Sequence, residues 1–432
     1  MVNSGRPARA GEARWRTASA VLAEVRRTPG VTRAEVAHRL RLSTGSSTEI
    51  TARLRELRLL VESPAAPRGR GRPTAVLRPH PAGPVVLVIE LRHDDWRAEV
   101  ATLDGALRPF AAGRHGGSTS AATSAATSAA ATGPVSGLAG GPAGEAGAPE
   151  PVLAELAEVI AMAGRRFGGR LRAVSMAVAA TVADGRLVDA SSLGWPPVDL
   201  AALTELPLLV GNDATLAGVA EARTGAATGS RTGLHLLVEA GIGGCLTAEG
   251  RPVRGATGAA GEYGHLPFAD RALRCHCGAA GCWELEVGGT ALARRLGEPP
   301  PASPRGYTVE VLTRARTEPP AGAALVETAS ALAAGIAGLV NLHDPDIVTL
   351  GGLAGPVRAA APAEFAAAYR GGLMAFRRAQ PPPVLDASHG EHGPRRGAAL
   401  VGLDHITTEA ALAGWADEQV AADDRRTRSR RC

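Results

Sequence analysis

The sequence predicts an α/β body preceded by a small winged helix-turn-helix domain of the DNA-binding kind. Three observations lead to this fold class. Buried-strand patterns alternate with helical periodicity after residue 84, which is typical of α/β layers. Two helix-capping signals lie close together between residues 32 and 57. Residues 1–80 carry 16 Arg, 6 Glu and no Asp, so a basic arm of net charge +10 precedes a body of net charge −5, which indicates nucleic acid as a partner.

Composition restricts the class of protein further. The chain has 432 residues, 45% of them hydrophobic, which is enough for two or three domains with a sizeable core. It contains no run of 18 apolar residues and does not open with a signal-peptide pattern, so we expect a cytoplasmic protein without a membrane partner. Five cysteines do not suggest a disulfide scaffold; clustered, they point to metal binding or catalysis. All 47 basic residues are arginine, which says little about function.

Three helices are expected in the amino-terminal domain. Residues 18–25 have helical apolar spacing that ends before Pro29-Gly30. Thr32 and Glu35 form a capping box that opens a second helix through Leu40. Ser43 is the N-cap of a third helix, in which Ile50, Leu54 and Leu57 share one face. Two short helices joined by a tight turn fit helix-turn-helix geometry, with the third helix entering the DNA groove.

A small hairpin follows the third helix. Residues 59–61 and 74–77 are expected to pair as strands, and the tip between them carries three arginines separated by glycine. Arginines on a thin backbone can enter the minor groove of A·T-rich DNA, whereas the other interpretation is a flexible basic linker. The candidate DNA-contacting residues of the whole domain are Arg33, Thr44, Ser46, Ser47, Thr48, Arg53, Arg68, Arg70 and Arg72.

The body begins with a buried strand after Pro84 and a hairpin partner at residues 98–103. Residues 111–149 are a low-complexity, Ala/Ser/Thr/Gly-rich segment, which we interpret as a disordered insertion. A helix at 151–167 and strands at 171–179 and 208–210 follow. The expected division of the chain is a winged helix-turn-helix domain at 1–81, a first lobe at 84–225 that contains the insertion, a second lobe at 226–415 whose end returns to the first, and a disordered tail at 416–432.

Three of the five cysteines lie within eight positions of one loop. His265, Cys275, Cys277 and Cys282 have the spacing H-x9-C-x-C-x4-C, and three thiolates with one imidazole make a closed tetrahedral Zn²⁺ set of the structural kind. The spacing differs from the common C-x2-C knuckle. A redox or catalytic thiol is the competing hypothesis, although no C-x-x-C pair is present in the loop.

The loop closely resembles the signature of the ROK family (repressors, open reading frames and kinases). Its pattern, G-E-x-G-H followed by C-x-C-G-x-x-G-C-x-E, is matched by residues 261–265 and 275–284. The resemblance extends to residues 211–214, to Glu221, to the glycine-rich approach at 254–261, and to the strand-turn segment 346–352. It implies the actin-like ATPase architecture of two α/β lobes around a cleft, and the winged domain resembles the repressor branch of the family.

The resemblance also implies a sugar site. In the sugar kinases of the family, the hexose is held by the residues that match Asn212, Asp213, Glu262, His265 and Glu284, with the aspartate as general base. Carboxylates and amides are suited to sugar hydroxyls, and His265 could offer one ring nitrogen to zinc and the other to the sugar. For Asp213 the plainer interpretation is a helix N-cap, and both roles can hold together. Ala179-Ala180 and Ser191-Ser192 depart from the family pattern near the expected sugar rim, so specificity could be altered or sugar binding lost.

The nucleotide motifs of the family are altered in this chain. Kinases of the family carry a phosphate-binding D-x-G-G-T hairpin, whereas residues 90–95 read ELRHDD, with bulky and acidic side chains in place of the glycines. Glu239-Ala240 stands where the kinases have Gly-Thr, and we interpret Gly241, Gly243 and Gly244 as a tight turn. Two changes at the same ligand indicate that ATP is not bound.

These observations predict a sugar-responsive transcriptional regulator, most simply a repressor with structural zinc. We expect it to bind operator DNA as a homodimer or higher homo-oligomer, and a sugar or sugar derivative to shift its DNA-binding domains; whether this releases DNA or promotes binding stays open at the level of sequence. The protein would not be an enzyme. The alternative is an ATP-dependent sugar kinase that carries a DNA-binding domain, which the retained Asp213 favours. A third possibility is a DNA-binding protein whose pocket is vestigial.

Overall fold

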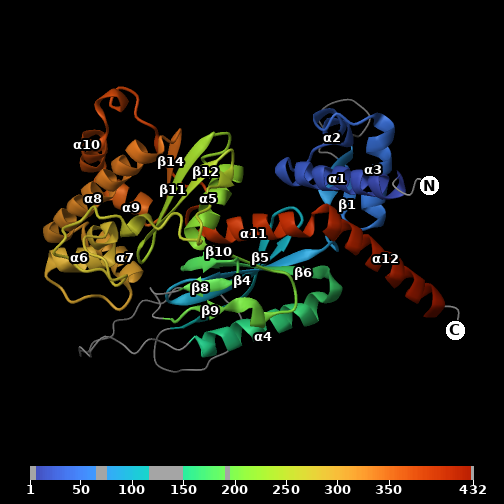
Figure 1. Ribbon diagram of the computed structural model, residues 1–432, viewed down its shortest axis with the longest axis horizontal. Helices are drawn as coiled ribbons and strands as arrows, with labels where there is room; N and C mark the ends of the chain where they lie inside the picture. Colours follow the sequence, from blue (N-terminus) through green and yellow to red (C-terminus); the bar gives the residue numbers. More distant parts are fainter. Residues whose placement is uncertain (1–5, 65–74, 116–148, 190–194, 430–432) are drawn as a thin grey trace.

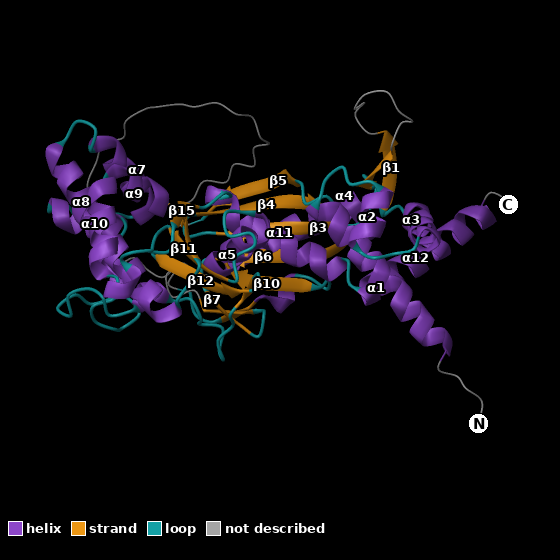
Figure 2. Ribbon diagram, turned by 90° about the horizontal axis from the view of Figure 1, so that it is seen from above, coloured by secondary structure: helices purple, strands orange, loops and turns teal. Residues whose placement is uncertain are grey.

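The computed structural model describes residues 6–64, 75–115, 149–189 and 195–429. The winged helix-turn-helix domain and the second lobe lie at opposite ends of the molecule, with the first lobe between them (Figures 1 and 2). The expected mixed α/β fold of two lobes is confirmed, and the helices and strands that precede it are consistent with a winged helix-turn-helix domain.

The amino-terminal domain has the predicted helices. They are α1 (Arg6–Arg27), α2 (Arg33–Arg39) and α3 (Thr44–Glu56), followed by the antiparallel strands β1 (Leu60–Pro64) and β2 (Ala75–Pro79). Thr32 and Glu35 form the capping box, and the Ser43 hydroxyl accepts a hydrogen bond from the Ser46 amide at the start of α3. The predicted hairpin is therefore present, and its tip lies outside the described residues.

The first lobe is built on a five-stranded sheet in the order β10-β6-β3-β4-β5. Its strands are β3 (Val85–Leu91), β4 (Asp95–Thr102), β5 (Leu107–Arg114), β6 (Leu171–Val178) and β10 (Leu208–Asn212). Every residue of β3 is buried, as its continuous apolar run predicts, because helices cover both faces of the sheet. Helix α4 (Glu150–Phe167) covers one face and α11 (Gly393–Ile406) the other. A small sheet, β7 (Thr181–Ala183), β8 (Leu187–Asp189) and β9 (Val198–Asp199), lies beside it.

The second lobe has a sheet in the order β13-β12-β11-β14-β15. Its strands are β11 (Thr232–Val238), β12 (Ile242–Ala248), β13 (Arg251–Pro252), β14 (Ile347–Gly352) and β15 (Val384–Asp386). Its helices are α6 (Gly289–Leu296), α7 (Pro304–Arg314), α8 (Pro319–His343), α9 (Ala354–Ala360) and α10 (Pro362–Gly372). Helix α8 is long and apolar enough to cross a membrane by length and composition, but its buried residues pack into the core of this lobe.

Two helices connect the lobes. Helix α5 (Asp213–Thr224) leaves the first-lobe sheet and packs on β11 and β12 of the second lobe, whereas α11 returns to cover β3 and β6. The two helices touch closely, because a Cβ added at Gly397 would lie 1.9 Å from the Leu216 carbonyl oxygen. A change in the angle between the lobes would therefore alter the packing of this helix pair.

The last helix, α12 (Glu409–Ser429), attaches the winged domain to the body. The Trp415 indole nitrogen donates to the Leu57 carbonyl at 2.8 Å, and Trp415 shares one hydrophobic core with α1, α3 and α11. The winged domain thus packs against the first lobe and is more than a tethered module.

Two boundary predictions are wrong. Residues 111–114 belong to β5 and pair with β4, so the insertion does not begin at residue 111; residues 116–148 lie outside the described part of the chain. Residues 416–429 continue α12, where a disordered tail was expected. Trp415 and Ala416 are buried at the start of this stretch and pack in the same hydrophobic core as residues of the winged domain.

Candidate functional site

The cysteine loop brings its four expected ligands together. The side-chain ligand atoms of His265, Cys275, Cys277 and Cys282 all lie within 4.8 Å of one another. The sulfur atoms of Cys277 and Cys282 are 3.7 Å apart, close to the edge of about 3.7–3.8 Å that a tetrahedron with Zn–S bonds of about 2.3 Å requires. Gly278 and Gly281 turn the loop with φ of +90° and +77°. The donor set and its spacing fit Zn²⁺ with no ligand position left for chemistry.

In His265 and in Glu284, the two polar atoms of the side chain have different neighbours. The Nδ1 atom of His265 lies 3.7 Å from the Cys275 sulfur, while Nε2 points toward Glu262 at 3.9 Å. Glu284 accepts from the Cys275 thiol through Oε1, at 3.0 Å, and a Cβ added at Gly241 would lie 2.7 Å from Oε2. The two ring nitrogens of His265 thus face different groups, Nδ1 the cysteines of the loop and Nε2 the carboxyl of Glu262. His276 and Glu284 form a second possible set with His265.

The first two residues of the expected sugar site lie where β10 passes into α5. Asn212 is the N-cap of this helix: its Oδ1 accepts from the Thr215 amide at 2.9 Å, and its Nδ2 donates to the Ala180 carbonyl at 3.2 Å. Asp213 accepts from the Ala214 amide at 2.7 Å. The N-cap role that the sequence suggested for Asp213 therefore belongs to Asn212, the residue before it.

Glu262 connects this end of α5 to the cysteine loop. Its Oε1 accepts from the Thr181 hydroxyl at 3.2 Å, next in sequence to the Ala180 carbonyl that receives Asn212. Glu262 and Glu284 approach His265 at 3.9 and 3.6 Å, so these three residues form one group. Asn212 reaches this group through the neighbouring residues Ala180 and Thr181. Asp213 is connected to it by the negative charge of Glu262, which acts on the Asp213 carboxyl. Ser191 and Ser192, expected at its rim, lie outside the described residues.

The carboxyl of Asp213 lies in an environment that disfavours its charge. Burial, followed by the negative charges of Glu90, Glu239 and Glu262, raises its pKa to about 7 despite the hydrogen bond from Ala214. A carboxyl with such a pKa can be protonated near neutral pH and can then donate as well as accept. Hydroxyl-rich ligands suit a group that can do both.

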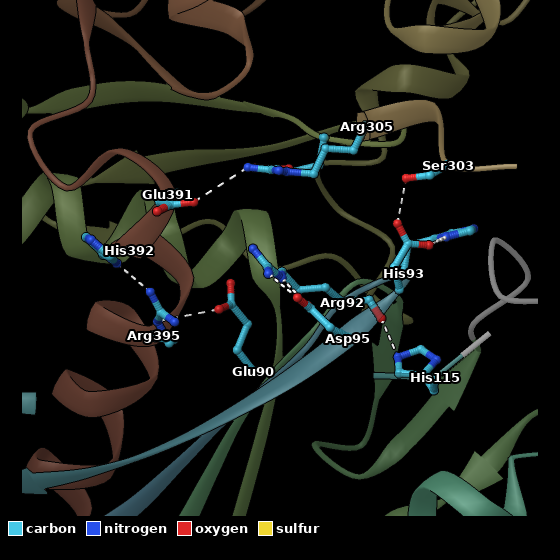
Figure 3. Close-up of polar contacts among 12 residues, drawn as sticks. Glu90, Arg92, His93, Asp95, His115, Ser303, Arg305, Glu391, His392 and Arg395 are labelled. Carbon is cyan, nitrogen blue, oxygen red and sulfur yellow. Dashed lines mark hydrogen bonds and ion pairs between the residues drawn. The ribbon is translucent and has the colours of Figure 1, made fainter. Parts of the chain in front are cut away.

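The hairpin that would hold phosphate in a kinase is closed by its own side chains. Arg92 forms a bidentate ion pair with Asp95, at 2.6 and 2.5 Å, across the turn between β3 and β4. Asp94 accepts from the Ser303 hydroxyl of the second lobe at 2.7 Å. Guanidinium and carboxylate groups occupy the turn where a phosphate-binding hairpin offers backbone amides (Figure 3), and that ATP is not bound here stays a prediction.

Further charges from distant parts of the chain meet in the same region. Arg305 of α7 pairs closely with Glu239 and lies 3.5 Å from Glu391, just before α11. Arg395 of α11 faces the buried Glu90 at 3.4 Å, and burial raises the pKa of Glu90 to about 7 although the Arg395 charge opposes this. Figure 3 shows Glu90, Arg305, Glu391 and Arg395 around the end of β3. Sequence reasoning missed Arg305, Glu391 and Arg395, because no local motif marks them.

The glycines after Glu239 only partly form the expected turn. The Glu239 amide donates to the Gly241 carbonyl at 3.0 Å, so residues 239–241 do turn tightly. Gly243 and Gly244 are instead in strand β12. A Cβ at Gly243 would lie 2.7 Å from that of Ala214, and one at Gly244 would lie 2.4 Å from the Tyr263 ring. These two glycines allow α5 and the cysteine-loop segment to approach the strand.

The helix-turn-helix residues divide by exposure. Thr44, Ser46 and Thr48 are exposed on α3. Ser47 is 2% exposed and faces the domain interior, so its inclusion among the DNA-contacting residues is wrong: it lies one position from the outward face of the helix. Arg53 pairs with Glu56 at 3.3 Å, and Arg33 lies 3.9 Å from Glu62. Arg68, Arg70 and Arg72 lie outside the described residues.

Comparison with known proteins finds a match to the ROK family over residues 145–404. The chain is 32% identical to the kanosamine kinase of Amycolatopsis mediterranei over 278 residues, which cover 63% of this chain and 86% of that protein. It is 30% identical to the glucokinase of Streptomyces coelicolor over 227 residues, covering 47% of this chain and 71% of the glucokinase.

Among solved structures, a ROK family transcriptional regulator described as a homologue of the E. coli MLC protein matches with a TM-score of 0.66 and 20% identity. That match covers 94% of this chain and all of the regulator. A ROK family glucokinase from Streptomyces griseus, in complex with glucose and AMPPNP, matches with a TM-score of 0.57 and 23% identity, covering 74% of this chain and 99% of the kinase. The regulator thus shares the fold over a larger part of the chain than the kinase does.

Proposed function

This chain belongs to the ROK family, and we propose that within it the protein is a DNA-binding transcriptional regulator, most simply a repressor, that responds to a sugar without phosphorylating it. The observation that carries the proposal is the joint presence of two features. A winged helix-turn-helix domain is packed on the body through Trp415, and the place of the phosphate-binding hairpin is taken by the Arg92–Asp95 ion pair.

DNA binding is supported by the exposed face of α3. This helix presents small hydroxyl side chains, with arginines nearby and a β-hairpin behind it, which is the arrangement in which a helix enters the major groove and a wing contacts the flanking backbone. Small hydroxyl groups can contact phosphate or base edges, so readout by this helix would be modest and the basic wing would add affinity. The protein would act in the cytoplasm as a homodimer on two half-sites about one helical turn apart, roughly 34 Å.

Sugar binding is supported by the set formed by Asn212, Asp213, Glu262, His265 and Glu284. Their carboxyl, amide and imidazole groups converge between α5 and the cysteine loop, and such groups exchange several hydrogen bonds with a hydroxyl-rich ligand. Zinc held by His265 and the three loop cysteines would have a structural role, since all four positions come from protein. When bound, the ion would fix the His265 ring with Nε2 toward Glu262.

Absence of phosphoryl transfer is supported by the charges in the former nucleotide region. A triphosphate would have to displace the Arg92–Asp95 and Arg305–Glu239 pairs, and it would meet the carboxylates of Glu90 and Glu239 without glycine amides to compensate. Asp213 would then only bind the sugar, because a general base can activate a sugar hydroxyl for phosphoryl transfer only when a phosphoryl donor is bound.

A sugar kinase with an attached DNA-binding domain is the second candidate. Asp213 favours it, because this residue matches the general base of the family's kinases, and the curated relatives named above are kinases. In that case the ion pairs around Arg305 would have to open when nucleotide binds.

The test measures DNA binding and phosphoryl transfer on the same preparation. Random-sequence selection should recover a preferred duplex whose affinity falls steeply with salt, as phosphate contacts require. A coupled ADP-release assay with a panel of hexoses, amino sugars and N-acetylated sugars should stay at background. Turnover above background would favour the kinase, and failure to select any duplex would contradict the regulator.

A further inference from the structure

Asp404, in the last turn of α11, binds two arginines that come from different functional parts of the chain. Its Oδ1 accepts from Arg26 at 2.5 Å, and its Oδ2 accepts from Arg223. Arg26 is in α1 of the winged domain, and Arg223 is in the last turn of α5. Each oxygen of one carboxylate therefore holds one arginine. The Arg26 side chain is only 12% exposed, whereas the Asp404 side chain is 43% exposed, so the pair has one buried end and one that water reaches.

Helix α5 links Asp404 to the candidate sugar site. The helix begins at Asn212 and Asp213 and has 12 residues, so Arg223 lies about 15 Å along the helix from the sugar residues. A helix of this length moves as a rigid unit, and a tilt at its first turn displaces its last turn. Its contact with α11 is close at Gly393 and Gly397, where an added Cβ would lie 3.0 Å from the Ala217 side chain and 1.9 Å from the Leu216 carbonyl oxygen. Such packing favours a discrete change in helix angle over gradual sliding.

Helix α1 carries the other end of the connection. It forms a second ion pair with the body, between Arg16 and Glu409 at 3.0 Å, with both side chains well exposed. That pair joins α1 to α12 without touching α5. Among the ion pairs of the described residues, those of Asp404 are the ones that join α5 to the winged domain. The burial of Arg26 lowers its pKa, and the nearby Arg223 charge adds to this while Asp404 opposes it, so the two arginines repel each other and share one counter-ion.

We infer that Asp404 is the residue through which occupation of the sugar site changes the position of the DNA-binding domain. This inference rests on the proposed function. A sugar that draws Asn212 and Asp213 toward Glu262 and His265 tilts α5 and moves Arg223 relative to Asp404. The carboxylate then holds Arg26 in a different geometry, and α1 shifts with the winged domain attached to it. The linkage is reciprocal, so DNA binding must change sugar affinity by the same factor.

The test compares Asp404→Asn with a matched variant, Glu409→Gln, which removes the exposed α1–α12 pair and leaves Asp404 intact. The DNA probe is a duplex recovered by random-sequence selection. The sugar probe is whichever of glucose, N-acetylglucosamine and glucose 6-phosphate gives calorimetric binding. The readout is the ratio of duplex Kd with and without that sugar, a quantity that a merely structural role would leave unchanged.

For the wild type we expect a ratio of at least about fivefold, the lower end of ordinary allosteric coupling. Asp404→Asn should reduce the ratio to below about twofold while sugar binding persists, and Glu409→Gln should keep the wild-type ratio. If Asp404→Asn does not fold, Arg223→Gln removes the same link from the α5 side and should give the same loss. A wild-type ratio in either Asp404→Asn or Arg223→Gln overturns the inference. A wild-type protein whose duplex Kd ignores every sugar it binds overturns the proposed function instead, and the inference with it.

Discussion

Replacing Asp213 by asparagine should stabilise the protein, and more so at high pH. Asparagine has nearly the same shape, keeps an oxygen for the Ala214 amide and carries no charge. The pKa of Asp213 is raised from 3.8 to about 7, chiefly by burial and then by Glu90, Glu239 and Glu262. The natural residue thus has an energetic cost that asparagine avoids, as is common at binding sites.

The sign and size of the effect follow from proton linkage. Below pH 3.8 the carboxyl is protonated in both the folded and the unfolded chain, and the cost is absent. As pH rises from 3.8 to about 7, the unfolded chain loses the proton that the folded chain retains, so stability falls; above about 7 the cost is complete. At about 1.4 kcal/mol per pKa unit, the cost is about 2 kcal/mol at pH 5 and about 4 kcal/mol at pH 8. Local relaxation reduces both, so we expect Asp213→Asn to gain about 1–2 kcal/mol more at pH 8 than at pH 5.

The assay is chemical denaturation of both proteins at pH 5 and pH 8. Asp199→Asn is the control, because Asp199 also accepts from an amide at a helix start, that of Ala201, but its side chain is 44% exposed. The effect of Asp199→Asn on the free energy of unfolding should differ by less than about 0.5 kcal/mol between pH 5 and pH 8. A loss of stability in Asp213→Asn at pH 8, or an equal effect at both pH values, would refute the interpretation of Asp213 as a partly buried carboxyl whose charge the acidic site disfavours.

Three further outcomes are expected. Cys277→Ser or a chelator should remove bound zinc and lower the free energy of unfolding by more than about 3 kcal/mol. His276→Ala, which lies outside the four-ligand set, should retain the metal in elemental analysis. Freshly purified wild-type protein that contains no zinc would contradict the prediction. Arg70→Ala should weaken DNA binding and reduce the slope of log K against log salt by about 1, and an unchanged slope would make residues 68–72 a linker. Arg305→Ala should lower the free energy of unfolding by about 1 kcal/mol, since its pairs with Glu239 and Glu391 are partly exposed. ATP should raise the Tm of neither the wild type nor this variant. A higher Tm of the wild type with ATP would show that the nucleotide region still opens.

Much of the fold follows from local signals in the sequence. The capping box of Thr32 and Glu35, the N-cap Ser43 and the apolar strand 85–91 act over a few residues, and each lies where it was expected. The cysteine loop was equally readable, because its four ligands lie within 18 positions and need only two glycine turns to meet. These features depend on contacts between residues close together in the chain, so residue types and their spacing are enough to predict them.

Other features depend on contacts between residues far apart in the chain. Trp415 meets Leu57 across 358 positions, which is why the helical nature of residues 416–429 and the docking of the winged domain were missed. Glu90 is in β3 and Arg395 is in α11, the helix that packs on the sheet, and the two residues share no sequence motif. The sequence predicts that the phosphate hairpin is altered, but only the fold reveals which side chains occupy the turn. Strand β5 was assigned in part to the insertion because its small residues resemble the low-complexity segment beside it.

The central claim is that a sugar bound between the lobes alters DNA affinity without any nucleotide. Fluorescence anisotropy of a selected duplex, titrated with the wild-type protein in the presence and absence of a bound sugar and then again with ATP and Mg²⁺, tests it most directly. We predict a shift in duplex Kd of at least about fivefold with sugar alone, and the same shift when ATP is added. A duplex Kd that responds only when ATP accompanies the sugar would contradict the account.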